Sequence, residues 1–393
     1  MKAAAARAEA PMSVLMIGNF LSASRSVRFV CEDLAEALAA AGWNVVAASA
    51  RAGRAARLAD MLATAWSRRA EYAAAQIDVY SGPSFLWAES AAALLRRIGK
   101  PHALTLHGGN LPGFARRWPR RVRRLLEGAD VVTSPSRYLA RALASLRGDI
   151  RVIPNPLALE RYPFRLRSAP RPRIVWLRAF HGIYRPELAP AVLRAVLARH
   201  PDATLTMAGP DKGDGSLAAT RAAAERAGVA DRLTILGAVE KRDVPRVLAG
   251  GEIFLNTTDV DNTPVSVLEA MACGLCVVTT DAGGIPDLAF DGENALVAPR
   301  GDSEALARAV SRAVEDARLS ARISRGGRAK AEESDFPRVL DAWRILLGEL
   351  AARAGEAREN AGEARENTGE ARENAGEARE NTGEAVKDAV RPA

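Results

Sequence analysis

Short apolar runs alternate with helical stretches along most of the chain, and this alternation limits the fold more than any other feature. The apolar run Val14–Phe20 is followed by a loop, a helical stretch over 28–41 and a second apolar run, Trp43–Ser49. This order is that of a parallel βαβ unit. Because the pattern repeats, the sequence predicts an α/β fold with doubly wound parallel sheets. Further strands are expected at Ile77–Gly82, His102–His107, Val131–Ser136, Ile174–Arg178, Ala203–Ala208, Leu233–Gly237, Ile253–Thr257 and Val277–Thr280.

A segment rich in proline and arginine, 157–173, interrupts the alternation, so we expect a domain boundary there. A length of 393 residues also favours two or three domains over one. We expect a flexible arm over 1–11 and a tail over 355–393 that repeats GEAREN with a seven-residue period. Alanine is the only apolar residue present throughout the repeats, and each repeat also contains glycine. The tail is therefore expected to be disordered or a marginal helix.

The charge of the chain predicts an anionic partner. The formal charge is +8, and because the acidic tail contributes −4, the residues before it carry +12. Such an excess suits a diphosphate donor, an anionic membrane face or nucleic acid. No apolar run of about 18 residues occurs, and the first residues lack the apolar region of a signal peptide. The three cysteines, Cys31, Cys273 and Cys276, give no disulfide framework, so we expect a cytoplasmic protein.

The stretch 256–299 contains the strongest chemical pattern. Asp261 lies in a loop after an apolar strand, and a second carboxylate, Glu269, follows eight residues later. Between them, Thr263 suits a helix N-cap and Pro264 suits the first helical position, so a helix is expected to begin at about 264. Free backbone N–H groups at a helix start bind anions. A phosphate there, with a carboxylate close by for a sugar diol, would form a nucleotide-sugar pocket.

Several spaced motifs resemble those of the retaining glycosyltransferases of family 4. They are IPN at 153–155, AGP at 208–210, and the D-x7-E pair followed by AMACGLCVV, GGIPDL and DGENALV. The resemblance implies the GT-B architecture, in which two Rossmann-like domains face each other across a cleft. We expect the acceptor domain over 12–165 and the nucleotide-sugar donor domain over 166–335. A helix over 336–354 is expected to cross back to the first domain.

The family resemblance implies transfer of a sugar from a nucleotide-diphosphate donor with retention of anomeric configuration. The acceptor would be a glycan, a lipid-linked molecule or a small molecule. No metal and no other cofactor is expected, and the four scattered histidines show no metal-ligand spacing. Two alternatives stay open: a nucleotide-sugar epimerase of the same fold, and a catalytically impaired scaffold that binds a partner.

The resemblance also implies roles for single residues. Glu269 would hold the ribose hydroxyls, and Asp261, where the family has glutamate, would contact the transferred sugar. Arg178 lies at a strand end, where ligands of open α/β sheets bind, and would clamp the diphosphate. His107 ends a strand of the first half and would face the donor sugar. The family's lysine after the arginine is absent here. Arg185 and His181 are the candidate replacements for that lysine. The other expected donor contacts are Lys212, Asn262, Thr263, Ser266 and Val267.

A basic segment over 116–124 holds six arginines around Trp118. One interpretation is a solvated helix face. The other is a peripheral contact with anionic lipid at the inner face of the membrane, which would suit a lipid-linked acceptor. Nucleic-acid binding is disfavoured, because no recognised binding motif accompanies the charge.

Overall fold

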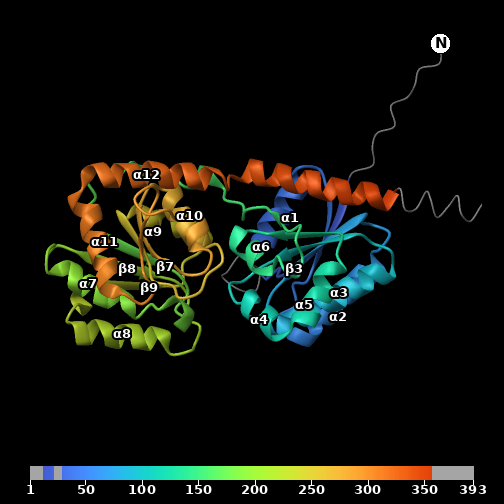
Figure 1. The fold of residues 1–393 in the computed structure, drawn as a ribbon, viewed down its shortest axis with the longest axis horizontal. Helices are drawn as coiled ribbons and strands as arrows, with labels where there is room; N and C mark the ends of the chain where they lie inside the picture. The colour runs from blue at the N-terminus through green and yellow to red at the C-terminus, as the bar shows by residue number, and fades with distance from the viewer. Residues whose placement is uncertain (1–11, 22–28, 356–393) are drawn as a thin grey trace, which may run out of the picture.

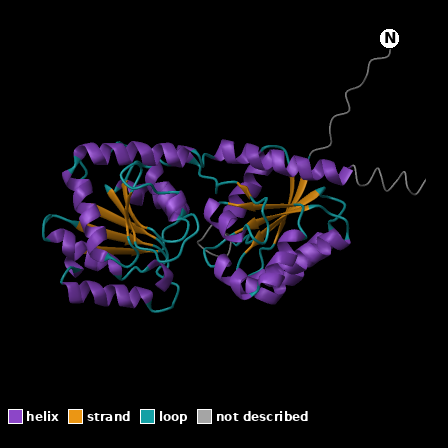
Figure 2. Ribbon diagram, viewed as in Figure 1, coloured by secondary structure: helices purple, strands orange, loops and turns teal. Residues whose placement is uncertain are grey.

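The computed structural model describes residues 12–21 and 29–355 and consists of two α/β domains (Figure 1). Each domain contains a six-stranded sheet in which every pairing is parallel, and helices cover both faces of each sheet (Figure 2). The predicted α/β fold with two Rossmann-like domains is therefore confirmed. The central strands, such as β3, β4, β10 and β11, are buried on both faces because parallel sheets carry their crossover helices on either side.

The first domain has the strand order β2-β1-β3-β4-β5-β6. All six residues of β3 and all five of β4 are buried, which explains their nearly continuous apolar sequences. The strands are β1 (Ser13–Ile17), β2 (Asn44–Ala48), β3 (Ala74–Val79), β4 (His102–Leu106), β5 (Val131–Ser134) and β6 (Arg151–Val152). The helices are α1 (Val30–Ala40), α2 (Arg54–Ser67), α3 (Phe85–Arg97), α4 (Leu111–Arg117), α5 (Pro119–Glu127) and α6 (Arg137–Leu143).

The second domain has the strand order β12-β11-β10-β7-β8-β9. The strands are β7 (Arg173–Leu177), β8 (Thr204–Ala208), β9 (Leu233–Gly237), β10 (Ile253–Asn256), β11 (Cys276–Thr280) and β12 (Leu296–Ala298). The helices are α7 (Leu188–Leu197), α8 (Ser216–Ala227), α9 (Val244–Ala249), α10 (Val265–Ala272), α11 (Ser303–Glu315) and α12 (Ala317–Glu332). Short 3-10 turns occur at Gly82–Ser84, Leu159–Arg161, Gly182–Tyr184, Ala230–Arg232, Lys241–Asp243 and Ile285–Asp287.

Two consecutive helices run along one side of both domains (Figure 1). Helix α12 packs on the second domain against α10, and the helix over 336–355 packs on the first domain. Trp343 and Leu347 of that last helix are buried against Val14 and Met16 of β1. The expected arm over 1–11 and nearly all of the repeat tail lie outside the described residues.

The two crossings between the domains lie side by side. Leu157 donates its backbone N–H to Ser334 at 2.7 Å and accepts one from Phe336 at 3.0 Å. Leu157, Leu159 and Tyr162 pack in the core of the second domain. The expected boundary between residues 165 and 166 therefore lies too late in the chain, because the apolar side chains after 156 already belong to the second domain.

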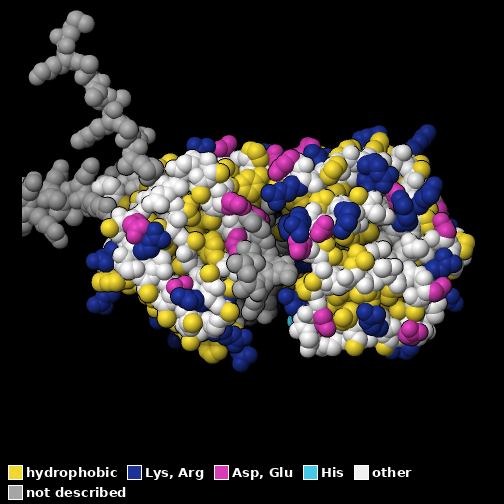
Figure 3. Space-filling view, turned by 180° about the vertical axis from the view of Figure 1, so that it is seen from behind, with side chains coloured by type: hydrophobic (Ala, Val, Ile, Leu, Met, Phe, Trp, Pro, Cys, Tyr) yellow, Lys and Arg dark blue, Asp and Glu magenta, His cyan; other side chains and the backbone are white. Residues whose placement is uncertain are grey.

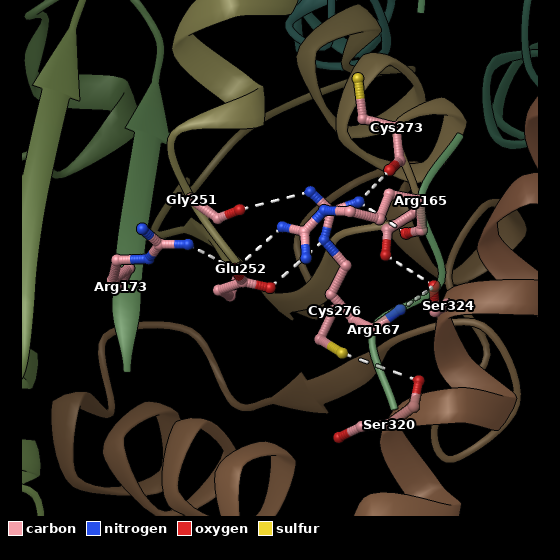
Figure 4. Close-up of polar contacts among 10 residues, drawn as sticks. Arg165, Arg167, Arg173, Gly251, Glu252, Cys273, Cys276, Ser320 and Ser324 are labelled. Carbon is pink, nitrogen blue, oxygen red and sulfur yellow. Dashed lines mark hydrogen bonds and ion pairs between the residues drawn. The ribbon is translucent and has the colours of Figure 1, made fainter. Parts of the chain in front are cut away.

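A buried carboxylate attaches the proline- and arginine-rich linker to the second domain (Figure 4). Glu252, which is 5% exposed, lies just before β10. It pairs with Arg165 at 2.8 Å, with Arg173 at 2.6 Å and with Arg167 at 3.5 Å. The guanidinium of Arg167 is itself buried and also donates to the carbonyl oxygens of Arg165 and Gly251. The cluster is a structural anchor at the amino-terminal edge of the sheet.

We expect Glu252→Ala to lower the free energy of unfolding of the second domain by about 3–5 kcal/mol, because it leaves the buried charge of Arg167 without its carboxylate. Urea denaturation followed by circular dichroism measures the change. Glu225→Ala, at an exposed site on α8, is the matched control and should leave the transition in place. An equally small effect of both substitutions would contradict a stabilising role for this cluster.

Candidate functional site

Loops from both domains meet where the carboxyl ends of the parallel strands face each other. A Cβ added to Gly109, which follows β4, would lie 3.0 Å from the carbonyl carbon of Asp261 in the loop after β10. A Cβ on Gly283, which follows β11 and has φ +56°, would lie 2.0 Å from the carbonyl oxygen of Asp261. Only glycine permits both approaches. Figure 3 shows the groove between the domains, with Lys and Arg side chains along the rim of the second domain.

Arg178 and Asp261 form an ion pair in this groove. Their side chains are 14% and 11% exposed. Asp261 also accepts the backbone N–H of Asn262 at 2.8 Å, and the Arg178 guanidinium lies 4.0 Å from the ring centroid of Tyr184. The Nε atom of Arg178 is buried and has no hydrogen-bond partner among the described residues. The structure thus brings together Arg178, which is expected to bind the diphosphate, and Asp261, which is expected to bind the transferred sugar.

Glu269 lies within α10 and has two partners from other elements. Its Oε1 atom accepts a hydrogen bond from the Tyr162 hydroxyl at 2.6 Å. The same atom forms an ion pair with Lys241 Nζ at 2.5 Å. Burial and the neighbouring Glu269 charge raise the pKa of Tyr162 well above its usual range. A role for Lys241 in holding Glu269 was not predicted, because Lys241 lies on a different strand-end loop.

Helix α10 begins at Val265, with Pro264 as its N-cap and without a side-chain cap. The predicted N-cap, Thr263, is therefore one residue too early. Its hydroxyl does not cap the helix because it donates to the Pro135 carbonyl of the first domain at 3.4 Å. The backbone N–H groups of Val265 and Ser266 make no hydrogen bond within the described residues. The Ser266 hydroxyl is also buried there without a partner. Free donors at a helix start are what the predicted anion site requires, and its role stays a prediction.

The remaining expected donor ligands differ in how available they are. Asn262 accepts a hydrogen bond from Ser136 across the domain interface. The side chain of Val267 is buried in the core, and its N–H donates to Pro264, so neither group is free. Arg185 pairs with Glu187 at 2.5 Å and with Asp259 at 3.0 Å.

Two further candidate cations lie after β7 and β8. The ring of His181 is 42% exposed and accepts the N–H of Ile183 at 3.2 Å. Lys212 is exposed, and its ammonium group contacts no carboxylate in the described part of the chain. Within the described residues, neither His181 nor Lys212 forms a hydrogen bond or ion pair with Arg178 or Asp261. Their roles stay predictions.

His107 is held by a buried carboxylate that the sequence patterns did not reveal. Its Nε2 atom lies 3.0 Å from Asp78 Oδ1, and its ring stacks on Tyr80 with centroids 5.1 Å apart. Asp78 also accepts from Gln76 at 2.9 Å. Burial raises the pKa of Asp78, but the charge and hydrogen bond of His107 and the hydrogen bond of Gln76 outweigh it, so the pKa is lowered. Two polar residues, Gln76 and Asp78, inside a short buried strand were the available signal.

Among residues 12–21 and 29–355, no group of three His, Cys, Asp or Glu side chains is arranged to hold a metal ion. Over the same residues, no helix has both the length and the apolar character needed to cross a membrane.

We expect Asp78→Asn to lower the free energy of unfolding at pH 7 by about 1–3 kcal/mol, because a buried charged hydrogen bond is lost. The folded-state pKa of Asp78 is below its ordinary value of 3.8, so its stabilisation is present above that pH. It is lost as the pH falls from that value through the lowered pKa, so the difference between the variant and the wild type should begin to shrink below about pH 4. Thermal melting between pH 3 and pH 7 measures this.

The exposed Asp202→Asn is the control for Asp78→Asn and should show no pH-dependent difference from the wild type. A difference for Asp78→Asn that stays constant down to pH 3 would rule out an ionised Asp78.

Family models match both domains of the chain. A model described as Glycosyltransferase Family 4 matches residues 26–161, and a model described as Glycosyl transferases group 1 matches residues 172–316. The 2-deoxystreptamine N-acetyl-D-glucosaminyltransferase of Streptomyces fradiae is 32% identical over 260 residues, which is 59% of this chain and 61% of that protein. A GDP-mannose-dependent phosphatidylinositol monomannoside mannosyltransferase of Mycolicibacterium smegmatis is 28% identical over 53% of this chain and 59% of its own length.

The match is shorter for one subunit of the human phosphatidylinositol N-acetylglucosaminyltransferase, which is 47% identical over 64 residues, 16% of this chain and 13% of its own length. The chain thus spans less than two thirds of each of these relatives. Among solved structures, sucrose-phosphate synthase from Thermosynechococcus elongatus has a TM-score of 0.74 at 18% identity, covering 87% of this chain and all of that one. Anabaena HepE with UDP and glucose has a TM-score of 0.69 at 17% identity, covering 86% and 100%. These likenesses establish the GT-B fold.

Proposed function

Because this chain belongs to glycosyltransferase family 4, we propose that it transfers a sugar from a nucleotide-diphosphate donor to an acceptor with retention of anomeric configuration. One observation carries the proposal. Arg178 Nε, on the side chain that pairs with Asp261, and Ser266 Oγ, at the start of α10, are buried and have no hydrogen-bond partner within the described residues. Buried polar groups are normally satisfied, so donors left over in a groove indicate an anionic ligand.

In our scheme the donor would displace existing ion-pair partners when it binds, because the charged groups of the site already pair with one another. The diphosphate would take hydrogen bonds from Arg178 and from the start of α10, which frees Asp261 to accept from a hydroxyl of the transferred sugar. Ribose hydroxyls would bind the second oxygen of Glu269, whose Oε1 is held by Tyr162 and Lys241. His107, oriented by Asp78, would donate to or accept from the sugar on the side of the first domain.

In the reaction, the bond between the sugar and the diphosphate would break as negative charge grows on the leaving oxygen. Arg178 and the helix start would stabilise that charge, which is where preorganised donors accelerate a reaction most. The acceptor would attack from the face that the diphosphate leaves, and the departing phosphate oxygen would take the acceptor's proton. No metal and no protein nucleophile takes part in this scheme. A double displacement would instead need a carboxylate nucleophile opposite a carboxyl acid.

The acceptor class is proposed from the relatives. Their names describe enzymes that act on 2-deoxystreptamine and on phosphatidylinositol or its mannoside. We propose a polar acceptor rich in hydroxyl groups, either free or carried on a lipid, bound against the first domain.

We expect Glu269→Gln to weaken donor binding about 10–100-fold, because hydrogen bonds from ribose to a charged acceptor are lost. A panel of UDP-, GDP- and ADP-sugars is screened by thermal shift and slow donor hydrolysis, and the affinity for the best donor is then measured for both proteins. Exposed Glu225→Gln should bind like the wild type. If no donor in the panel stabilises the wild type or is hydrolysed, the proposed activity is wrong. Nuclear magnetic resonance of the product tests retention.

The basic segment supports a peripheral contact with an anionic membrane face at the cytoplasmic side. Helix α5 buries Val122 and Leu125 toward the domain, while Arg120 and Arg124 are exposed and form no ion pair within the described residues. Next to them, Trp118 is 47% exposed. An aromatic ring beside several cations suits the headgroup region.

We expect Arg120→Glu with Arg124→Glu to reduce flotation with phosphatidylglycerol-containing vesicles at least about tenfold, because each basic residue near an anionic surface contributes about 1 kcal/mol. Vesicles of phosphatidylcholine alone should retain little of either protein. The matched pair Arg221→Glu with Arg226→Glu, on α8, is the control. Unchanged flotation of the Arg120 and Arg124 variant would exclude this segment as the contact.

A further inference from the structure

A second crevice lies between the two domains, on the side of α6 and α12. Its volume is about 820 Å³, within the range of small-molecule sites. Arg178, Glu269 and Lys241, which hold the proposed donor, do not line it. Thr263, an expected donor contact, does line it together with Pro135 and Ser136, but its hydroxyl already donates to the Pro135 carbonyl. Ser136 likewise donates to Asn262.

Both crossings between the domains form walls of this crevice. Ile153 and Pro154 come from the first crossing, and Ser334 and Arg338 come from the second. Helix α6 of the first domain and the turn Ile285–Asp287 of the second face each other across it, joined by an ion pair between Arg141 and Asp287 at 2.5 Å. A movement of one domain relative to the other would therefore change the shape of the crevice.

The charges lining the crevice are unbalanced. Its two acids are already paired: Asp287 with Arg141, and Glu333 with Lys330 at 2.7 Å. The two other cations come from different elements, Arg137 from α6 and Arg338 from the helix over 336–355. No carboxylate of the described chain lies within ion-pair distance of either one. An excess of two positive charges is suited to a phosphate dianion, which arginine binds with two parallel hydrogen bonds.

The remaining surface of the crevice is not only cationic. The Oδ2 atom of Asp287 is buried and accepts no hydrogen bond from the described protein, so it can take one from a ligand hydroxyl. Leu268 and Val339 provide an apolar floor. Phe290 is 44% exposed at its edge, with Lys330 5.9 Å from its ring centroid. The crevice therefore offers cations for a phosphate, an acceptor for a hydroxyl group and an apolar surface for the rest of a ligand.

We propose that this crevice is a second binding site for a hydroxylated organic phosphate, separate from the donor site. The phosphate would bind Arg137 and Arg338, and a hydroxyl group would donate to Asp287. A bound ligand would tie α6 to the second crossing and so favour one spacing of the domains. The chemistry is shared by nucleoside monophosphates and sugar phosphates, and Phe290 would favour the former by stacking.

Calorimetric titrations with AMP and with glucose 6-phosphate test the site. We expect binding of at least one probe, weakened at least about tenfold by Arg137→Ser with Arg338→Ser, since two charge-assisted contacts are lost. Binding should persist in Arg178→Ala, which removes the main cation of the donor site. Tighter binding of AMP would identify stacking on Phe290, and Phe290→Ala should then make the two probes equal. The pair Arg221→Ser with Arg226→Ser is the control.

If the double variant does not fold, the single variants Arg137→Ser and Arg338→Ser are measured, and each should weaken binding several-fold. No binding of either probe at millimolar concentration overturns the proposal. It is also overturned by binding that survives both arginine substitutions, or that the α8 control weakens equally. Binding that disappears only in Arg178→Ala assigns the probe to the donor site and has the same consequence. None of these outcomes depends on whether sugar transfer is observed.

Discussion

The buried and partly buried carboxylates of the candidate site depend on partners that come from distant parts of the chain. Asp261 is held by Arg178, Glu269 by Tyr162 and Lys241, and Asp78 by His107. An ionised carboxylate that leaves water without a partner costs several kcal/mol, so each pairing constrains two segments together. The positions of the loop after β10, the start of α10 and the end of β4 are therefore set by charge as well as by apolar packing.

Under the proposed function, these pairings would let a groove between two domains be both stable and reactive. The cation that neutralises a carboxylate in the folded protein would bind the phosphate of the donor, and the carboxylate it leaves would accept from hydroxyl groups. The cost of desolvating these groups is met during folding and not at the moment of binding, which is the advantage of preorganisation. Gly109, which faces Asp261 from the first domain, allows the two domains to approach closely, and Gly283 allows two loops of the second domain to do the same.

Much of the fold and part of the site could be predicted because they depend on local patterns. Glu269 lies on the expected helix, and Arg178 lies one residue after β7, where the sequence put it at the end of the strand. The error at the helix start has a tertiary cause, since the Thr263 hydroxyl bonds to the first domain instead of capping its own helix. Asp78 was missed because strand patterns describe burial and do not say which buried group has a partner.

By itself, the sequence determined the alternation of strands and helices, the presence of two domains, and a pair of acids with an arginine near strand ends. These features follow from hydrophobic periodicity and short spacings, which act within one segment. Only the tertiary structure decided which cation meets which acid, where the linker joins the second domain, and that the last helix packs on β1. Arg178 and Asp261 are far apart in sequence, and they meet because β7 and β10, which they follow, are neighbours in one sheet. The contact of Leu157 with Ser334 depends in turn on how the two crossings pack side by side.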